Sequence, residues 1–143
     1  MARKIGIRIV VMALAAAAAS AAGTARAEAT SVEQVYGVWA PTPQCHLDGG
    51  FLIFGARTMI DTSLTRNSRA TVSYEVEADG VAVVLVREIV ARRDGTWEPG
   101  PLTQLGTRVV VQRQGDELRT LRVVDRNGRS HPGEANATLY ACR

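Results

Sequence analysis

The chain has few of the residues that most often carry catalysis or bind metal ions. Its 143 residues include two cysteines and two histidines, and aromatic residues make up 5%. Two of each are too few for a Cys/His zinc module, and there is no C-x-x-C pair for dithiol redox chemistry. The nucleophile motif G-x-S-x-G and the phosphate-binding P-loop motif are also absent. The sequence therefore predicts a protein that is not an enzyme and has no metal site and no cofactor.

Lysine is equally scarce, because the chain has a single copy, Lys4. The other cationic side chains are arginines. Four of the 17 basic residues, but none of the 14 acidic ones, lie in residues 1–27. The formal net charge is therefore +3 for the whole chain and −1 for residues 28–143. Nucleic-acid binding needs a basic surface, so we expect no nucleic-acid partner.

The N-terminal residues have the organisation of a secretory signal peptide. Its three parts are a positive start (Arg3, Lys4 and Arg8), an uncharged apolar run at residues 9–19, and small residues around a cleavage site at Ala25-Arg26-Ala27. We predict a signal peptide at residues 1–27 and a single domain at residues 28–143. Cleavage near Ala22, or an uncleaved anchoring helix, are the alternatives.

Export would place the mature protein in the periplasm or outside the cell. The apolar run of 11 residues is about half of the ~20 residues that a membrane-spanning helix needs. We therefore expect no membrane span after cleavage.

The two cysteines are Cys45 and Cys142, which lie 97 residues apart. An even number of cysteines in an exported protein indicates disulfide bonding, because the compartment is oxidising. Two cysteines allow one intrachain pairing. We predict a structural Cys45–Cys142 disulfide that ties the first strand region to the last.

The clearest secondary-structure signal is a β-hairpin. Residues 71–78 alternate strictly between apolar and polar side chains, which is the period of a half-buried strand. Asp79-Gly80 follows, a dipeptide typical of a type I′ turn. Residues 81–91, Val-Ala-Val-Val-Leu-Val-Arg-Glu-Ile-Val-Ala, then supply a second strand. In this prediction Glu75 and Glu77 lie on a solvated strand face.

The remaining segments predict more strands and turns and no long helix. Strand candidates are residues 36–40, 51–54, 57–64, 107–113, 118–125 and 137–142. We expect a short helical turn at 31–35 and a polar turn at 65–69. Short links favour antiparallel neighbours, so the sequence predicts an all-β fold, a small antiparallel up-and-down β-barrel of about seven or eight strands. A compact sandwich is the alternative, and the Cys45–Cys142 bridge favours the barrel.

Residues 37–45, Gly-Val-Trp-Ala-Pro-Thr-Pro-Gln-Cys, resemble the G-x-W opening of lipocalin- and avidin-like barrels. With the ending Leu139-Tyr140-Ala141-Cys142 they look like small exported bacterial barrel proteins that begin with G-x-W-A…C and end in a cysteine. The resemblance implies that Trp39 closes the narrow end of a barrel as a core residue. Two exported inhibitor families are similar in outline only. Barrel-type metalloprotease inhibitors have an earlier second cysteine, and C-type lysozyme inhibitors have a Ser-Gly-x-x-Tyr loop that is missing here.

One segment has the composition of a binding loop. Residues 92–101 are rich in proline and glycine, and Trp97 lies near Arg92 and Arg93. An exposed aromatic with arginine nearby is typical of interface hot spots. The alternative is that Trp97 folds back over one end of the barrel as a core cap.

Two functions compete on this evidence. The first is a periplasmic binding or inhibitor module that contacts another envelope protein, which predicts an exposed Trp97 and a filled barrel. The second is a lipocalin-like carrier of a small apolar ligand, which predicts an open apolar cavity. Short strands and few aromatics favour the filled barrel. A structural subunit of an envelope complex cannot be separated from the first function by sequence.

Overall fold

The computed structural model describes residues 29–46, 49–63 and 66–143. The predicted signal peptide at residues 1–27 lies outside the described residues. The strands are β1 (Gly37–Ala40), β2 (Leu52–Phe54), β3 (Thr58–Ser63), β4 (Arg66–Val76), β5 (Val81–Ala91), β6 (Trp97–Pro99), β7 (Arg108–Gln114), β8 (Glu117–Val124) and β9 (Thr138–Ala141). Two 3₁₀ turns, η2 (Leu102–Gln104) and η3 (Pro132–Glu134), complete the described elements. Within this part of the chain no helix is long and apolar enough to cross a membrane.

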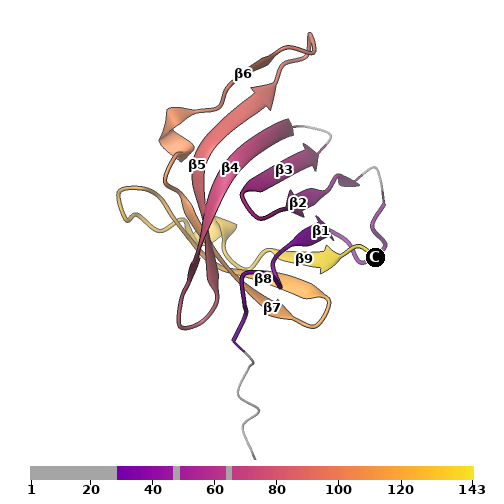
Figure 1. The fold of residues 1–143 in the computed structure, drawn as a ribbon, viewed down its shortest axis with the longest axis vertical. Coiled ribbons are helices and arrows are strands. Elements are labelled where there is room, and N and C mark those ends of the chain that lie inside the picture. The colour runs from indigo at the N-terminus through magenta and orange to yellow at the C-terminus, as the bar shows by residue number, and fades with distance from the viewer. Residues whose placement is uncertain (1–28, 47–48, 64–65) are drawn as a thin grey trace, which may run out of the picture.

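Eight of the strands form a closed antiparallel barrel (Figure 1). The order around the ring is β4-β3-β2-β1-β9-β8-β7-β5, and pairing of β4 with β5 closes it. β6 pairs with the far half of β5, beyond the residues that pair with β7, and so adds a ninth strand outside the ring. The predicted all-β, up-and-down barrel is confirmed.

The first and last strands of the barrel meet in a short seam. β1 and β9 pair antiparallel through Trp39 with Ala141 and Ala40 with Tyr140. The Cys142 amide adds a hydrogen bond of 2.8 Å to the Val38 carbonyl. The Cys45–Cys142 disulfide lies beside this seam, with its Cα atoms 5.8 Å apart. The predicted Cys45–Cys142 disulfide is therefore present, and it joins the first strand region to the last.

One end of the barrel is closed by a packed core around Trp39. Its side chain is 1% exposed, and Nε1 donates a hydrogen bond of 2.8 Å to the Val35 carbonyl. The Arg113 guanidinium lies over the Trp39 ring, 5.4 Å from its centroid. Arg113 also donates to the Gln34 carbonyl at 3.0 Å, which fixes the helical turn before β1 across this end. Trp39 is thus a core residue, as the resemblance implies.

The predicted β4–β5 hairpin is present, but its turn differs from the expected one. The strands pair from Val76 with Val81 onward, so residues 77–80 form the connection. Neither Asp79 nor Gly80 has a positive φ, so the turn is not type I′. Glycine is needed here for space, since a Cβ at Gly80 would lie 2.3 Å from the Val111 carbonyl oxygen.

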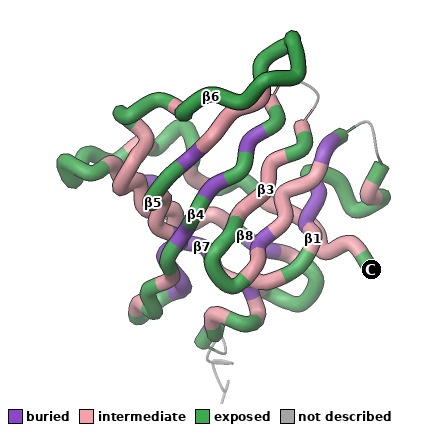
Figure 2. The backbone as a smooth tube through the Cα atoms, turned by 45° about the horizontal axis from the view of Figure 1, so that its top comes forward, coloured by how far each residue is buried: buried purple, intermediate pink, exposed green. Residues whose placement is uncertain are grey.

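β4 is longer than the sequence predicts. Residues 66–69, expected as part of a polar turn, belong to the strand, which alternates between buried and exposed side chains (Figure 2). Polar Ser68 faces inward and is buried, and Arg69 faces outward. The strand has period two here as well, but its inward positions are polar because they line the open end of the barrel.

The outer face near the β4–β5 connection carries an ionic cluster. Arg108 Nη2 lies 2.7 Å from Glu75 and 2.8 Å from Glu77, and Arg122 pairs with Glu77 and Asp79. Hydrogen bonds from Arg108, and then from Arg122, lower the pKa of Glu77, and Arg122 lowers the pKa of Asp79. The predicted outward orientation of Glu75 is confirmed. Glu77 was predicted on the same strand face, but it follows the end of β4 and is held between Arg108 and Arg122.

Candidate functional site

The barrel interior contains a cavity of about 570 Å³, whose described lining does not include Trp39. Its apolar wall consists of Leu52, Phe54, Met59, Val72, Val83, Leu85, Val109 and Val123. Phe54, Val72 and Val83 also belong to the core cluster, so they form the cavity floor. The interior is therefore not filled, contrary to expectation. β4 and β5 have 11 residues each and extend beyond the core. Their side chains that line the cavity there are Arg66, Ser68 and Glu88, which leave the space beside the apolar wall unfilled.

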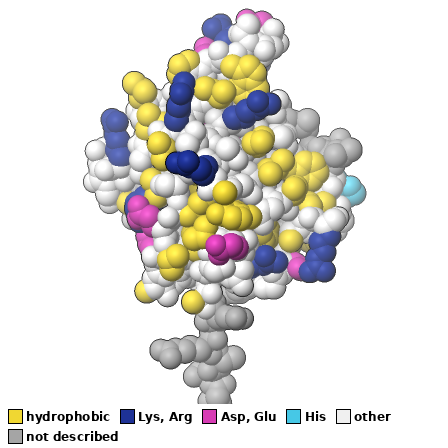
Figure 3. Space-filling view, viewed as in Figure 1, with side chains coloured by type: hydrophobic (Ala, Val, Ile, Leu, Met, Phe, Trp, Pro, Cys, Tyr) yellow, Lys and Arg dark blue, Asp and Glu magenta, His cyan; other side chains and the backbone are white. Residues whose placement is uncertain are grey.

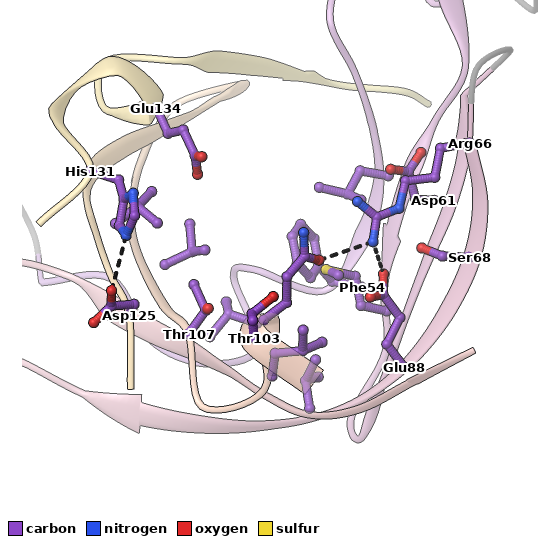
Figure 4. Close-up of a pocket in the computed structure, with 18 residues that line it drawn as sticks. Phe54, Asp61, Arg66, Ser68, Glu88, Thr103, Thr107, Asp125, His131 and Glu134 are labelled. Carbon is purple, nitrogen blue, oxygen red and sulfur yellow. Dashed lines mark hydrogen bonds and ion pairs between the residues drawn. The ribbon is translucent and has the colours of Figure 1, made fainter. Parts of the chain in front are cut away.

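An ion pair lies on one side of the cavity mouth (Figure 4). Arg66, the first residue of β4, donates from Nη2 to Glu88 Oε1 on β5 and to Gln104 Oε1 in η2, the latter at 3.0 Å. The Glu88 side chain is 3% exposed. Its second oxygen, Oε2, receives no hydrogen bond from the described residues.

A β-bulge places Glu88 in the cavity. Leu85 pairs with Val72 and Arg87 pairs with Thr71, so Val86 is an extra residue between them and is 52% exposed. The extra residue reverses the alternation of β5 beyond this point. Without it, Arg87 would face inward and Glu88 outward.

Gly100 provides the room that the buried carboxylate occupies. A Cβ at this position would lie 2.5 Å from Glu88 Oε2. The Gly100 amide donates to the Glu88 carbonyl at 2.9 Å, which holds the segment after β6 against β5. Any other residue at position 100 would push the carboxylate or this segment aside.

A second polar group faces the first across the mouth (Figure 4). Asp125 follows β8, and its Oδ2 lies 3.3 Å from His131 Nε2. Asp125 Oδ1 accepts hydrogen bonds of 2.9 Å from the amides of Asn127 and Arg129. The bond from Arg129, with further help from His131 and Asn127, lowers the pKa of Asp125. Glu134 in η3 points into the opening beside this pair.

The described lining of the cavity is acidic overall. It has four carboxylates, Asp61, Glu88, Asp125 and Glu134, but one arginine, Arg66, and one histidine, His131. They lie in two groups on opposite sides of the cavity, Asp125 with His131 and Glu134 on one side and Arg66 with Asp61 and Glu88 on the other (Figure 4). The site is thus an apolar chamber with a negatively charged rim.

The predicted binding residues lie elsewhere, on the β5–β6 hairpin. Trp97 on β6 pairs with Ala91 along the edge of β5, is 43% exposed, and has the Arg69 guanidinium 5.0 Å from its ring centroid. Arg92 forms an ion pair of 3.1 Å with Glu98, and Arg93 is exposed in the turn.

The structure therefore brings Trp97, Arg92 and Arg93 together on one hairpin, but the described cavity lining includes none of them. Trp97 lies on the outside of the barrel and does not cap either end. The hairpin extends beyond the barrel (Figure 1), and its tip carries charges of both signs (Figure 3).

Sequence reasoning missed Glu88, Arg66 and the carboxylates around the mouth. A signal was present, because Arg87 and Glu88 interrupt an otherwise apolar strand, and strict alternation does not say which of the two faces inward. Buried acids are rare unless they are paired or functional. The pairing partner could not be found from sequence, since Arg66 lay in a segment predicted to be a turn.

The fold and site define the class of this protein as a closed eight-stranded β-barrel with an internal, acid-rimmed cavity. Within the described residues no three His, Cys, Asp or Glu side chains are grouped to hold a metal ion. Comparison of the chain with protein-family models, with curated proteins and with solved structures finds no match.

Proposed function

We propose that this protein is an exported binding protein that holds a small, largely apolar molecule inside its barrel. The observation that carries the proposal is the cavity, whose volume of about 570 Å³ lies within the range of ~300–1,000 Å³ typical of small-molecule sites. Apolar walls with a few polar groups at one end are the usual composition of such sites. Of the two functions considered from sequence, the carrier is the one that predicts this cavity.

Export and the absence of catalysis are parts of the same proposal. The charged start, apolar run and small-residue site of residues 1–27 support a cleaved signal peptide. The Cys45–Cys142 disulfide supports an oxidising compartment such as the periplasm. The carboxylates at the mouth are used here for binding, because neither a nucleophile nor a base–nucleophile pair stands out among the motifs of the chain.

A second function, contact with another envelope protein, is favoured by the β5–β6 hairpin. Trp97 is 43% exposed on a hairpin that extends from the barrel, with Arg69 against its ring. Aromatic and arginine side chains are enriched in interface hot spots. The two functions use different surfaces, so one protein could have both.

The test of the cavity uses N-phenyl-1-naphthylamine, an uncharged dye that fluoresces more strongly in apolar surroundings. We expect the mature protein to bind it and to raise its fluorescence saturably. Val109→Trp should abolish the increase by filling the cavity. Val86→Trp is the matched control, because Val86 is exposed and is not part of the lining.

Circular dichroism of both variants would show whether they remain folded. Binding of the dye by Val109→Trp and by wild type alike would place the dye outside the cavity. Absence of any saturable binding of the dye to wild type would reject the carrier function.

A further inference from the structure

We propose that the outer face of β3, β4 and β5, next to Trp97, binds an acidic segment of another envelope protein. The proposal rests on the second function given above, contact with a partner protein, and states the chemistry of that partner. A carboxylate of the partner enters a groove between Arg69 and Arg87, and an apolar side chain beside that carboxylate packs on Ile89 and Trp97.

The groove lies on the outside of the barrel and has a volume of about 310 Å³. Its lining comes from three neighbouring strands and consists of Thr58, Arg69, Ala70, Thr71, Arg87 and Ile89. Thr58 lies opposite Thr71, and Thr71 lies opposite Arg87, so two short hydroxyl side chains are next to a long cationic one. The short side chains leave an indentation that a side chain of another protein can enter.

The groove is positively charged and contains no acidic residue in its described lining. Arg69 and Arg87 are diagonal neighbours, because Arg69 pairs with Ile89 and Arg87 pairs with Thr71. Neither guanidinium forms an ion pair with another described residue, whereas six other arginines do. Like charges close together on a sheet face repel each other. A carboxylate between the two guanidinium groups would relieve this repulsion and accept hydrogen bonds from both.

Acidic residues near the groove in the sequence are turned away from it or paired elsewhere. Glu88 and Asp61 face the cavity inside the barrel, and Glu88 pairs with Arg66. Glu98, which follows Trp97, pairs with Arg92 at 3.1 Å. None of these carboxylates lines the groove, so none of them occupies the position that the partner would take.

The groove has an apolar border, which gives the face the composition of a protein contact surface. One row across the strands contains Ile53, Ile60, Arg69, Ile89 and Pro99. The Trp97 ring lies against Arg69, with its centroid 5.0 Å from the guanidinium. Basic and hydrophobic side chains are intermixed on the upper part of this face (Figure 3). Protein interfaces are enriched in aromatic residues and arginine, and arginine binds carboxylates through two parallel hydrogen bonds.

An anionic membrane is the competing occupant of a basic, aromatic surface. Two features favour a protein. The groove is an indentation, which accepts a side chain better than it accepts a plane of headgroups. Asp94 and Glu98 are exposed on the same hairpin as Trp97, and an anionic membrane would repel both of them.

The experiment selects short random peptides, displayed on phage, against the mature protein. We expect the enriched peptides to contain Asp or Glu next to Leu, Phe or Trp. One such peptide is then synthesised, and its affinity is measured by isothermal titration calorimetry. Replacement of its Asp and Glu residues by Asn and Gln should weaken binding about tenfold or more, because a charge-assisted hydrogen bond contributes about this factor.

Variants of the protein locate the interaction. Arg69→Gln and Arg87→Gln should each weaken binding of the peptide about tenfold, and Trp97→Ala should weaken it severalfold. Arg129→Gln is the matched control and should bind as wild type does, because Arg129 is exposed and is not part of the described lining of the groove. All four positions are exposed, and circular dichroism shows whether each variant is folded.

The outcomes separate the acidic partner from the contact function on which it rests. Enriched peptides without acidic residues, or equal binding to wild type and to both arginine variants, would overturn the acidic partner. The contact function would still stand if Trp97→Ala weakened binding. Absence of any enriched peptide, or enriched peptides that none of the substitutions affects, would reject both.

Vesicles of phosphatidylethanolamine and phosphatidylglycerol test the membrane alternative. We expect the wild-type protein not to co-sediment with them at physiological salt. Co-sedimentation that Arg69→Gln and Arg87→Gln abolish would make this face a membrane-binding surface and would overturn the proposal.

Discussion

The two tryptophans of the chain have opposite roles, and their surroundings explain why. Trp39 is 1% exposed, bonds to the Val35 carbonyl and packs beneath Arg113. Trp97 is 43% exposed on a three-residue outer strand. The same residue type is therefore a core element at one position and a surface group at the other.

We expect Trp39→Phe to lower the free energy of unfolding by about 1–3 kcal/mol. The change leaves a gap in the closed end and leaves the Val35 carbonyl without its donor. Urea unfolding followed by far-ultraviolet circular dichroism measures it. Trp97→Phe is the control and should change stability by less than about 0.5 kcal/mol. Equal losses for the two variants would contradict the assigned roles.

At the scale of the strands, the alternation of apolar and polar residues predicted the regular parts of β4 and β5. The inward side of residues 71–76 and the extent of β5 were both visible in the period-two pattern. The bulge at Val86 was not, because one extra residue changes which side chains face inward without leaving a signature in composition. Glu88 therefore could not be placed in the cavity from sequence alone.

The error at residues 66–69 has a similar origin. Polar side chains normally mark turns or solvent-facing positions, and this stretch is Arg-Asn-Ser-Arg. Here the strand continues into the polar mouth of the cavity, so its inward residues are polar for a local reason. The part of the site that sequence missed is thus the part where the usual relation between polarity and exposure is reversed.

The ionic cluster on the outer face of β4, β7 and β8 should make the free energy of unfolding depend on pH in the acid range. The pKa values of Glu77 and Asp79 are lowered in the folded state, so the unfolded chain binds protons more readily. Their contribution to stability is complete above the ordinary pKa values of 4.5 and 3.8. It is lost as the pH falls through the lowered pKa values of the folded state.

We therefore expect Glu77→Gln to reduce stability at pH 7, by about 1 kcal/mol or less because the cluster is partly solvated. At pH 3 and below, the difference from wild type should become smaller. Urea midpoints measured across this range test the prediction. Glu117→Gln is the control, because it removes a surface carboxylate that lies outside this cluster. A stability difference between Glu77→Gln and wild type that grows on acidification would contradict the prediction.

For the molecule as a whole, the disulfide secures the shortest pairing in the ring. β1 and β9 share two register pairs, whereas β4 and β5 share nine. The bridge spans 97 residues, and closing so long a loop stabilises a fold by about 2–4 kcal/mol in practice. We expect the double variant Cys45→Ser/Cys142→Ser to lose about this much in urea unfolding. An unchanged midpoint would show that the seam holds without the bridge.

The same seam determines what this barrel becomes when it opens. A closed ring has no free strand edges, but a ring broken between β1 and β9 is a curled sheet with two of them. Each edge is complementary to the other, so β1 of one molecule can pair with β9 of a second in the register that both already use. We therefore expect strand exchange between copies when this seam opens, and the Cys45–Cys142 bond opposes it.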